Sequence, residues 1–200
     1  AIGYAALSTE DAHGGNVAVG RKALFAQDAG VDAYNVAVGY QAGVAVTTGI
    51  NNTLIGGLAG DAITTGDSNV AVGYDTLSAI DSGSRSTAIG YQALKTLNVG
   101  GIGANTAVGY NAGTLMTTGT LNTIVGAQAG DALTEGANNT LLGYTAGGAL
   151  TTGGSSTIIG AYAGDALTTG IRNTALGYGA LSTSVDGDKN TAIGYLALED

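Results

Sequence analysis

The sequence predicts an all-β fold, a parallel β-solenoid of about twelve 17-residue coils, because three observations agree. A short motif that ends in glycine recurs at a nearly constant interval along the whole chain. Strand-forming residues occupy the same positions in every repeat. Glycine accounts for 36 of the 200 residues while proline is absent, which excludes a collagen helix and suits stacked strands that need every backbone amide. We therefore expect residues 1–200 to form a single repeat array with almost no helix.

Each repeat is centred on one glycine, which we number position 0 of its coil. The eleven intervals between these glycines are 17 residues in nine cases and 19 residues in two. A second glycine occupies position +10 in ten of eleven coils, with His13 as the exception. Two regular glycines predict two backbone corners, so each coil should consist of strand, turn, strand and turn. The central glycines are Gly3, Gly20, Gly39, Gly56, Gly73, Gly90, Gly109, Gly126, Gly143, Gly160, Gly177 and Gly194.

The segment before the central glycine is an apolar strand. Position −1 is Ile, Val or Leu, position −2 is Ala, Leu or Ile, and position −3 is Thr or Val. None of the 21 charged residues (15 acidic and 6 basic) lies at positions −3, −2, −1, 0, +3 or +4, which predicts that these columns are interior. Residues −3 and −1 point to one side of a strand and residue −2 to the other. We therefore predict that both faces of this strand are buried, one against its own coil and the other against a second surface.

The side chains at +1 and −2 vary together. Most coils with Tyr at +1 have Ala at −2, and the three coils with a small residue at +1 have a large one at −2. Those three coils pair Leu54 with Gly57, Ile124 with Ala127 and Ile158 with Ala161. This exchange of volume predicts that the two positions share one packed layer.

An asparagine column precedes the strand at position −4, where Ser86 and Ser156 are the exceptions. Stacked amides can hydrogen-bond along the column and satisfy turn backbone, and a metal or glycan site is the less favoured alternative. We predict a structural ladder of Asn16, Asn35, Asn52, Asn69, Asn105, Asn122, Asn139, Asn173 and Asn190.

Both 19-residue coils carry their extra residues between the +10 glycine and the next asparagine, within Val31–Tyr34 and Gly101–Ala104. A turn that accepts extra residues without disturbing the repeat lies at the surface. Side chains leave the regular lattice there, so Tyr34 and Ile102 are the candidate surface contacts.

Composition leaves few groups for catalysis or nucleic-acid binding. The chain has no cysteine and one histidine, and its net charge is −9. An acidic chain repels a polyanion, and without cysteine there is no thiolate ligand or nucleophile. No apolar run reaches the roughly 18 residues of a membrane span. We expect no enzyme activity, no cofactor, no metal, no nucleic-acid partner and no membrane insertion.

Two loops imitate ligand-binding motifs. Gly100–Gly103 has the glycines of a phosphate loop but follows a corner and lacks the strand-to-helix context. Asp186–Asn190 begins like a calcium loop, yet Thr191 and Ala197 occupy the places of the required glycine and acid. We interpret both loops as solvated turns, and His13 as a surface residue.

Two repeated patterns suggest alternative activities. Asp131 and Asp165 lie two coils apart, about 9 to 10 Å, near the upper carboxylate spacing of inverting glycosidases. They occupy one regular column, and nothing in the sequence suggests a raised pKa. Thr-Thr-Gly corners such as Thr151–Gly153 are similar to the threonine arrays of ice-binding solenoids, but they lie at turns and are interrupted, for example by Glu135.

One chain is not expected to bury all of its apolar surface. Coils stacked at about 4.8 Å make a rod of roughly 55 to 60 Å, with an outward apolar strip of about 550 Å². Monomers rarely expose more than a few hundred contiguous Å² of apolar surface. Burial of the strip would contribute roughly 14 kcal/mol per chain before association costs. We predict self-association about the rod axis through the −2 column or the −3 and −1 columns.

The repeated cores resemble the head repeats of trimeric autotransporter adhesins and similar repeats of bacteriophage tail fibres. Asn-Thr-Ala-Val-Gly-Tyr at 105–110 and Asn-Thr-Ala-Ile-Gly-Tyr at 190–195 carry this resemblance. The 17-residue coil and the tyrosine column look more like the tail-fibre repeats. The resemblance implies a left-handed β-roll, an obligate homotrimer, and an attachment fibre that is extracellular, on a cell surface or on a virion.

These observations predict the structural shaft of a homotrimeric attachment fibre that projects a binding tip toward a host or surface. Its partners would be two identical chains and, through regions outside this segment, a cell-surface receptor or glycan. The alternatives are a carbohydrate-binding or carbohydrate-degrading spike surface and an ice-binding solenoid. The sequence begins at Ala1 inside one coil and stops at Asp200 inside another, so we expect an excerpt of a longer fibre.

Overall fold

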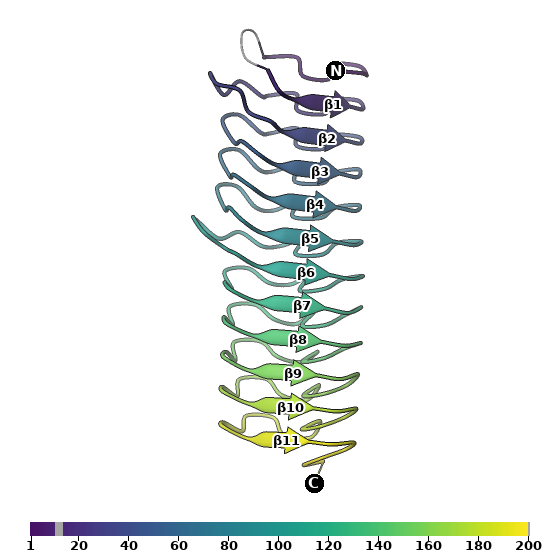
Figure 1. Cartoon of the computed structure of the whole chain (residues 1–200), viewed down its shortest axis with the longest axis vertical. Helices are drawn as coiled ribbons and strands as arrows, with labels where there is room; N and C mark the ends of the chain where they lie inside the picture. The colour runs from purple at the N-terminus through teal and green to yellow at the C-terminus, as the bar shows by residue number, and fades with distance from the viewer. Residues whose placement is uncertain (11–13, 200) are drawn as a thin grey trace.

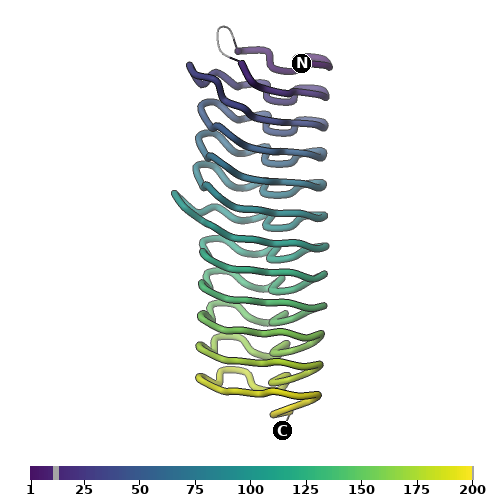
Figure 2. Tube along the Cα trace, viewed as in Figure 1, coloured from purple at the N-terminus to yellow at the C-terminus, as the bar shows by residue number. Residues whose placement is uncertain are grey.

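A computed structural model describes residues 1–10 and 14–199 as one rod of stacked coils (Figure 1). The chain moves one level along the rod with each repeat, as the Cα trace shows (Figure 2). Eleven short strands form a single parallel sheet in the order of the sequence. They are β1 (Val17–Val19), β2 (Val36–Val38), β3 (Thr53–Ile55), β4 (Val70–Val72), β5 (Thr87–Ile89), β6 (Thr106–Val108), β7 (Thr123–Val125), β8 (Thr140–Leu142), β9 (Thr157–Ile159), β10 (Thr174–Leu176) and β11 (Thr191–Ile193). The predicted parallel β-solenoid is confirmed, and the described ranges contain no helix.

Neighbouring strands pair without any shift in register. Between β6 and β7, for example, Thr106 pairs with Thr123 and Ala107 with Ile124. The two-residue insertions leave this register intact, since Thr87 of β5 still pairs with Thr106 across the second insertion. In the first coil Ile2 makes an isolated bridge to Val19. Residues of the same repeat position are therefore stacked directly along the rod.

Only the middle residue of each strand points into its own coil. Position −2 is buried in all eleven strands, whereas positions −3 and −1 are half-buried or exposed. The expectation that the −3 and −1 columns are interior is therefore wrong for the single chain, because they lie on the outer face of the sheet.

Position +7 supplies the large side chains that complete the core. Eight consecutive coils carry a large apolar residue at +7 in the sequence, but +7 is not among the columns predicted to be interior. These fully buried residues are Val46, Ile63, Ile80, Leu97, Met116, Leu133, Leu150 and Leu167.

The predicted shared layer of +1 and −2 is wrong. Tyr110 at +1 is 54% exposed, while Ala107 at −2 of the same coil is fully buried on the other side of the backbone. The position that exchanges volume with −2 is +4, which is Leu in several coils with Ala at −2 and Gly in every coil with a large −2 residue. A Cβ added to Gly60 at +4 would lie 2.8 Å from Cδ2 of Leu54, the −2 residue of the same coil, so the core has no room for one.

The same exchange also operates between adjacent coils. Gly43 and Gly113 at +4 share their own coils with Ala at −2, which leaves them unexplained within one coil. A Cβ on Gly43 would lie 2.7 Å from Leu54 Cδ1, and one on Gly113 would lie 3.1 Å from Ile124 Cδ1. Both large side chains come from the next coil along the rod, so packing volume is conserved between levels.

The two glycine columns have different physical causes. The central glycines have φ between +128° and +143°, a region almost closed to other residues, and a Cβ on Gly126 would lie 2.2 Å from the carbonyl oxygen of Gly143. Gly136 at +10 has no such φ, but a Cβ there would lie 2.2 Å from the carbonyl oxygen of Gly153. In most coils the +10 glycine is therefore required by close approach of the coils rather than by a corner conformation, which corrects the sequence prediction. Gly30 and Gly100, which precede the two inserted turns, are the exceptions, because an added Cβ meets nothing within 4 Å at either position.

We predict that Gly126→Ala destabilises the rod by at least about 3 kcal/mol, because the added methyl group meets backbone and the φ is unfavourable for alanine. Chemical denaturation followed by circular dichroism measures the change. Gly100→Ala is the matched control, because a Cβ there meets nothing within 4 Å, and it should change stability by less than about 0.5 kcal/mol. Equal effects of the two substitutions would contradict this account of the glycine column.

Candidate functional site

Seven of the nine asparagines at −4 are buried inside the rod, where their amide groups are hydrogen-bonded. Asn139 Oδ1 accepts a hydrogen bond from the backbone N–H of Ser156 in the next coil at 3.0 Å. Its Nδ2 donates to the carbonyl oxygen of Gly153 at 3.0 Å and so closes its own coil. The same two bonds recur at Asn35, Asn52, Asn122 and Asn173. This use of the amides leaves the column unsuited to metal binding or glycan attachment.

The remaining asparagines of the ladder follow the pattern with small changes. Asn69 and Asn105 make both bonds, and the N–H that donates to Asn69 Oδ1 belongs to Ser86 instead of an asparagine. Asn16 accepts from the N–H of Asn35 and donates to Glu10 Oε1 at 2.7 Å. The backbone N–H of Asn190 donates to Asn173 Oδ1 at 2.8 Å.

The outer face of the sheet carries apolar side chains at −1 and +1 beside a −3 column that is threonine in eight of the eleven strands and valine in three, and we call this surface the tyrosine strip. It consists of the −3, −1 and +1 columns, and the tyrosines at +1 are between 44% and 75% exposed. Tyr74, Tyr91 and Tyr110 stack with ring centroids 5.7 and 5.4 Å apart. Beside them at −1, aliphatic side chains such as Ile89 and Leu142 are about 40% exposed. The strip follows the sheet along the whole rod.

Gaps in the tyrosine column are filled from position +2. Ala161 interrupts the column, but the ring of Tyr162 lies 5.3 Å from that of Tyr144 and 5.7 Å from that of Tyr178, edge to face. At a second interruption, Ala127, the hydroxyl of Tyr144 donates to Gln128 Oε1 at 3.3 Å. The sequence did not reveal this replacement, because +2 has no fixed residue type.

Arg21 is the single charged side chain on the −3, −1 and +1 columns. Its guanidinium carbon lies 6.0 Å from the ring centroid of Tyr4 and 5.6 Å from that of Tyr40, and its Nη1 donates to the Tyr40 hydroxyl at 3.3 Å. The strip therefore offers aromatic and aliphatic contact area with almost no formal charge. Such a surface suits packing against another apolar surface rather than acid–base chemistry.

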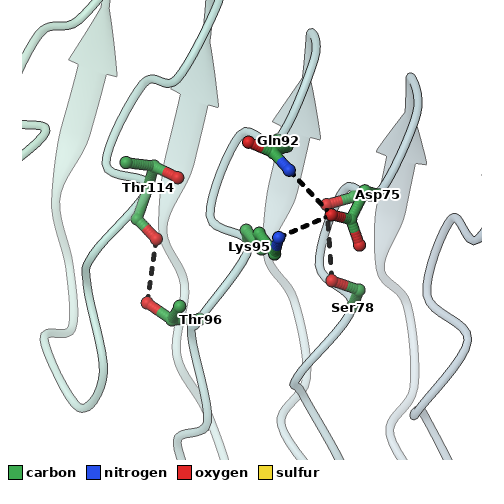
Figure 3. Close-up of polar contacts among 6 residues, drawn as sticks. All are labelled: Asp75, Ser78, Gln92, Lys95, Thr96 and Thr114. Carbon is green, nitrogen blue, oxygen red and sulfur yellow. Dashed lines mark hydrogen bonds and ion pairs between the residues drawn. The ribbon is translucent and has the colours of Figure 1, made fainter.

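A polar cluster at positions +2 and +5 links adjacent coils (Figure 3). The Lys95 ammonium lies 2.8 Å from Asp75 Oδ2, and Gln92 Nε2 donates to the same oxygen at 2.8 Å. Burial alone would raise the pKa of Asp75, but hydrogen bonds from Lys95, Ser78 and Gln92 outweigh it and lower that pKa. Lys95 and Gln92 belong to the coil after that of Asp75, so these contacts join adjacent coils.

The three aspartates at +5 have raised pKa values, contrary to the expectation for Asp131 and Asp165. Burial raises the pKa of Asp61, Asp131 and Asp165 above the ordinary value of 3.8. Asp61 Oδ1 is in addition buried without a hydrogen-bond partner. However, within the described residues no pocket is present, and no group of three or more acidic or histidine side chains could hold a metal ion. A raised pKa without a cleft does not make a glycosidase site.

The remaining sequence patterns serve local structure. In the glycine-rich turn, the Ser84 N–H donates to the Gly101 carbonyl at 2.8 Å, so this backbone pairs with the neighbouring coil instead of forming a phosphate cradle. Asp188 Oδ1 accepts from the N–H of Ile171 at 2.8 Å. His13 lies outside the described residues. The described part of the chain contains no apolar helix of membrane-spanning length.

The threonine corners form a column of their own. Thr134 Oγ1 donates to the carbonyl oxygen of Thr151 at 3.2 Å, and Thr151 Oγ1 donates to that of Thr168 at 3.1 Å. Thr47 and Thr117 make the same bond to the next coil. These hydroxyl groups are used along the stack, which disfavours an ice-binding array at this corner.

Comparisons with known proteins gave no match: no family model, no curated protein and no solved structure is significantly similar to this chain.

We predict that Asn139→Ala lowers stability by roughly 2 to 5 kcal/mol, because it leaves the buried Ser156 N–H and Gly153 carbonyl without their partner. Asn98→Ala is the control, since Asn98 lies exposed at position +8. Urea denaturation of both variants measures the difference. Similar midpoints for the two variants would show that the ladder contributes little.

We also predict that the rod is more stable at about pH 4 than at about pH 7. The raised pKa values of Asp61, Asp131 and Asp165 mean that the folded chain binds more protons than the unfolded chain just above pH 3.8. Their contribution is therefore present at low pH and is lost as pH rises through the raised values. Asp75 acts in the opposite direction, and its contribution is lost only as pH falls below 3.8 through its lowered pKa.

Denaturation midpoints at both pH values test this dependence. The triple variant Asp61→Asn, Asp131→Asn and Asp165→Asn should lose most of the difference, whereas the exposed control Glu135→Gln should retain it. An unchanged pH dependence in the triple variant would contradict the assignment.

Proposed function

We propose that this chain is a structural shaft segment of a homotrimeric attachment fibre, from a phage tail or a bacterial surface, that projects a binding tip toward a host. The trimer, the left-handed coil and the location outside the cell or on a virion follow from the resemblance of its repeats to adhesin heads and tail fibres. A shaft role needs no catalytic residues and no cofactor. Binding to a receptor or glycan would take place through a tip outside this segment.

The observation that carries this proposal is the tyrosine strip. Residues −3 to +1 span about 13 Å, and eleven to twelve coils at about 4.8 Å span about 55 Å, so the strip covers roughly 700 Å² per chain. In a trimer each strip is shared between two neighbours, so three strips around one axis would bury roughly 2,100 Å² in total, or about 700 Å² for each pair of chains. Because the −2 column is buried inside each coil, the proposed contact between chains would use the −3, −1 and +1 columns instead.

Cyclic symmetry suits this surface. The columns of the strip are stacked in register at a constant step. Identical chains arranged around one axis would therefore have equivalent coils at the same height. Uniform coils without a concave site also favour a spacer over a receptor-binding module.

The alternative functions have less support on the strip itself. Sugars pack on the open face of an aromatic ring, but Tyr74, Tyr91 and Tyr110 cover one another's faces by stacking. At the Thr-Thr-Gly corners the hydroxyl of the first threonine donates to the next coil, whereas the second threonine is exposed. Neither a carbohydrate-degrading spike nor an ice-binding array is favoured by a specific contact.

We expect the purified chain to have the mass of a trimer in light scattering. Replacing Ile89 and Leu142 by Asp would place unpaired charge in the contact between chains and should convert the trimer to monomers. Leu115→Asp is the matched control, because Leu115 is 52% exposed but lies at +6, outside the strip. Ile124 and Ile158 are unsuitable for this test, because both are core residues of the single chain.

A soluble, folded monomer formed by the unchanged chain would contradict the proposal. Loss of assembly in the Leu115→Asp control would show that a different face makes the contact.

A further inference from the structure

The first inserted turn presents one aromatic ring outside the tyrosine strip. Tyr34 lies at position −5 and is 60% exposed. Its ring lies against Gly15 of the preceding coil, where an added Cβ would be 2.8 Å from Tyr34 Cδ1. Among the described residues, the ring–ring contacts join other tyrosines and none involves Tyr34. Within that part of the chain, the Tyr34 ring is therefore supported by the backbone of Gly15 and is not stacked on another ring.

A carboxylate is fixed beside this ring. Asp32 Oδ1 accepts a hydrogen bond from the Gly14 N–H at 3.1 Å, and Asp32 Oδ2 accepts one from the Tyr34 hydroxyl at 3.5 Å. Asp32 is itself exposed, so its oxygens retain capacity for further donors. An anchored ring and an oriented acceptor thus lie together on the same exposed turn.

The second inserted turn lacks both features. Ile102 is 56% exposed at its tip, but it is aliphatic, and its neighbours Gly101 and Gly103 carry no side-chain acceptor. The two turns are otherwise comparable, because each adds two residues at the same place in the repeat. This difference makes the second turn an internal control for the first.

We propose that the Tyr34 turn is a weak binding site for a neutral pyranose sugar. The polarised C–H groups on one side of such a ring pack against the negative face of an aromatic side chain, here Tyr34. The sugar hydroxyls donate to the Asp32 carboxylate, and a hydrogen bond to a charged acceptor is stronger than one between neutral groups. The net charge of −9 and the Asp32 carboxylate disfavour acidic sugars.

This site goes beyond the spacer function, since it gives the shaft a binding activity of its own. A single exposed turn without a pocket supports only low affinity. Repetition of the turn on each chain of an assembly would raise the effective affinity for a polysaccharide or a glycan-covered surface. Binding of a monosaccharide does not require assembly, so the site can be tested independently of the trimer.

Saturation-transfer NMR on the purified chain tests the site with the methyl glycosides of glucose, galactose, mannose and N-acetylglucosamine, and with glucuronate as the acidic comparison. We expect transfer to the ring C–H protons of at least one neutral glycoside and none to glucuronate. Tyr34→Ala should reduce the transfer by about tenfold or more, while Tyr34→Phe should retain most of it, because the ring face remains. Asp32→Ala should weaken it, and Ile102→Ala should leave it unchanged.

Tyr34→Asn provides a second ring deletion, since Tyr34 has a φ of +53° and asparagine tolerates that conformation better than alanine. The circular dichroism spectrum and the mass in solution show that each variant is folded. Absence of transfer to all four neutral glycosides would overturn the proposal. So would transfer that persists in both ring-deletion variants, or transfer to glucuronate equal to that of the neutral sugars.

Discussion

The structure depends on one constraint, which is that each coil must rest directly on the next without any shift. The central glycines permit this spacing, because from Gly3 to Gly177 their backbone lies so close to the next coil that an added Cβ would meet a carbonyl oxygen at 2.2 to 2.6 Å. The parallel sheet, the asparagine ladder and the threonine column all require the same step. A residue in one coil therefore lies between the residues that occupy the same repeat position in the coils above and below it.

This constraint divides the side chains into an inner and an outer set. Positions −2, +4 and +7 share a small interior, so a large residue in one of them requires a glycine or alanine in another, within a coil or in the next. Positions −3, −1 and +1 point outward and are free of that volume limit, which allows tyrosine to repeat there. The rod is thus stable through its own core while it still presents a long apolar surface.

The same regularity limits the chemistry that the rod can perform. Stacked columns place like side chains next to one another, but they do not bring different functional groups together around a cavity. The half-buried aspartates at +5 illustrate this, because burial raises their pKa values while no cleft is present to hold a substrate. Different side chains meet in a new arrangement where the repeat is broken, as at the first inserted turn, where Asp32 and Tyr34 lie together.

The sequence by itself determined the coil length, the parallel stacking and the position of the strand before the central glycine, because these follow from the period and from residue types that recur in every coil. The second strand predicted for each coil is wrong, because in the described residues the chain returns through turns and only one strand per coil joins the sheet. It also indicated that the inserted turns lie at the surface. It misassigned the partner of the −2 column, since a sequence pattern shows that two positions vary together but not on which side of the backbone each lies. Tyr110 and Ala107 belong to one coil and face opposite directions, whereas Gly113 meets Ile124 of the next coil. Only the tertiary structure decided which apolar face was inside, because that depends on how the chain returns through the +3 to +7 segment and places its large +7 side chains against position −2.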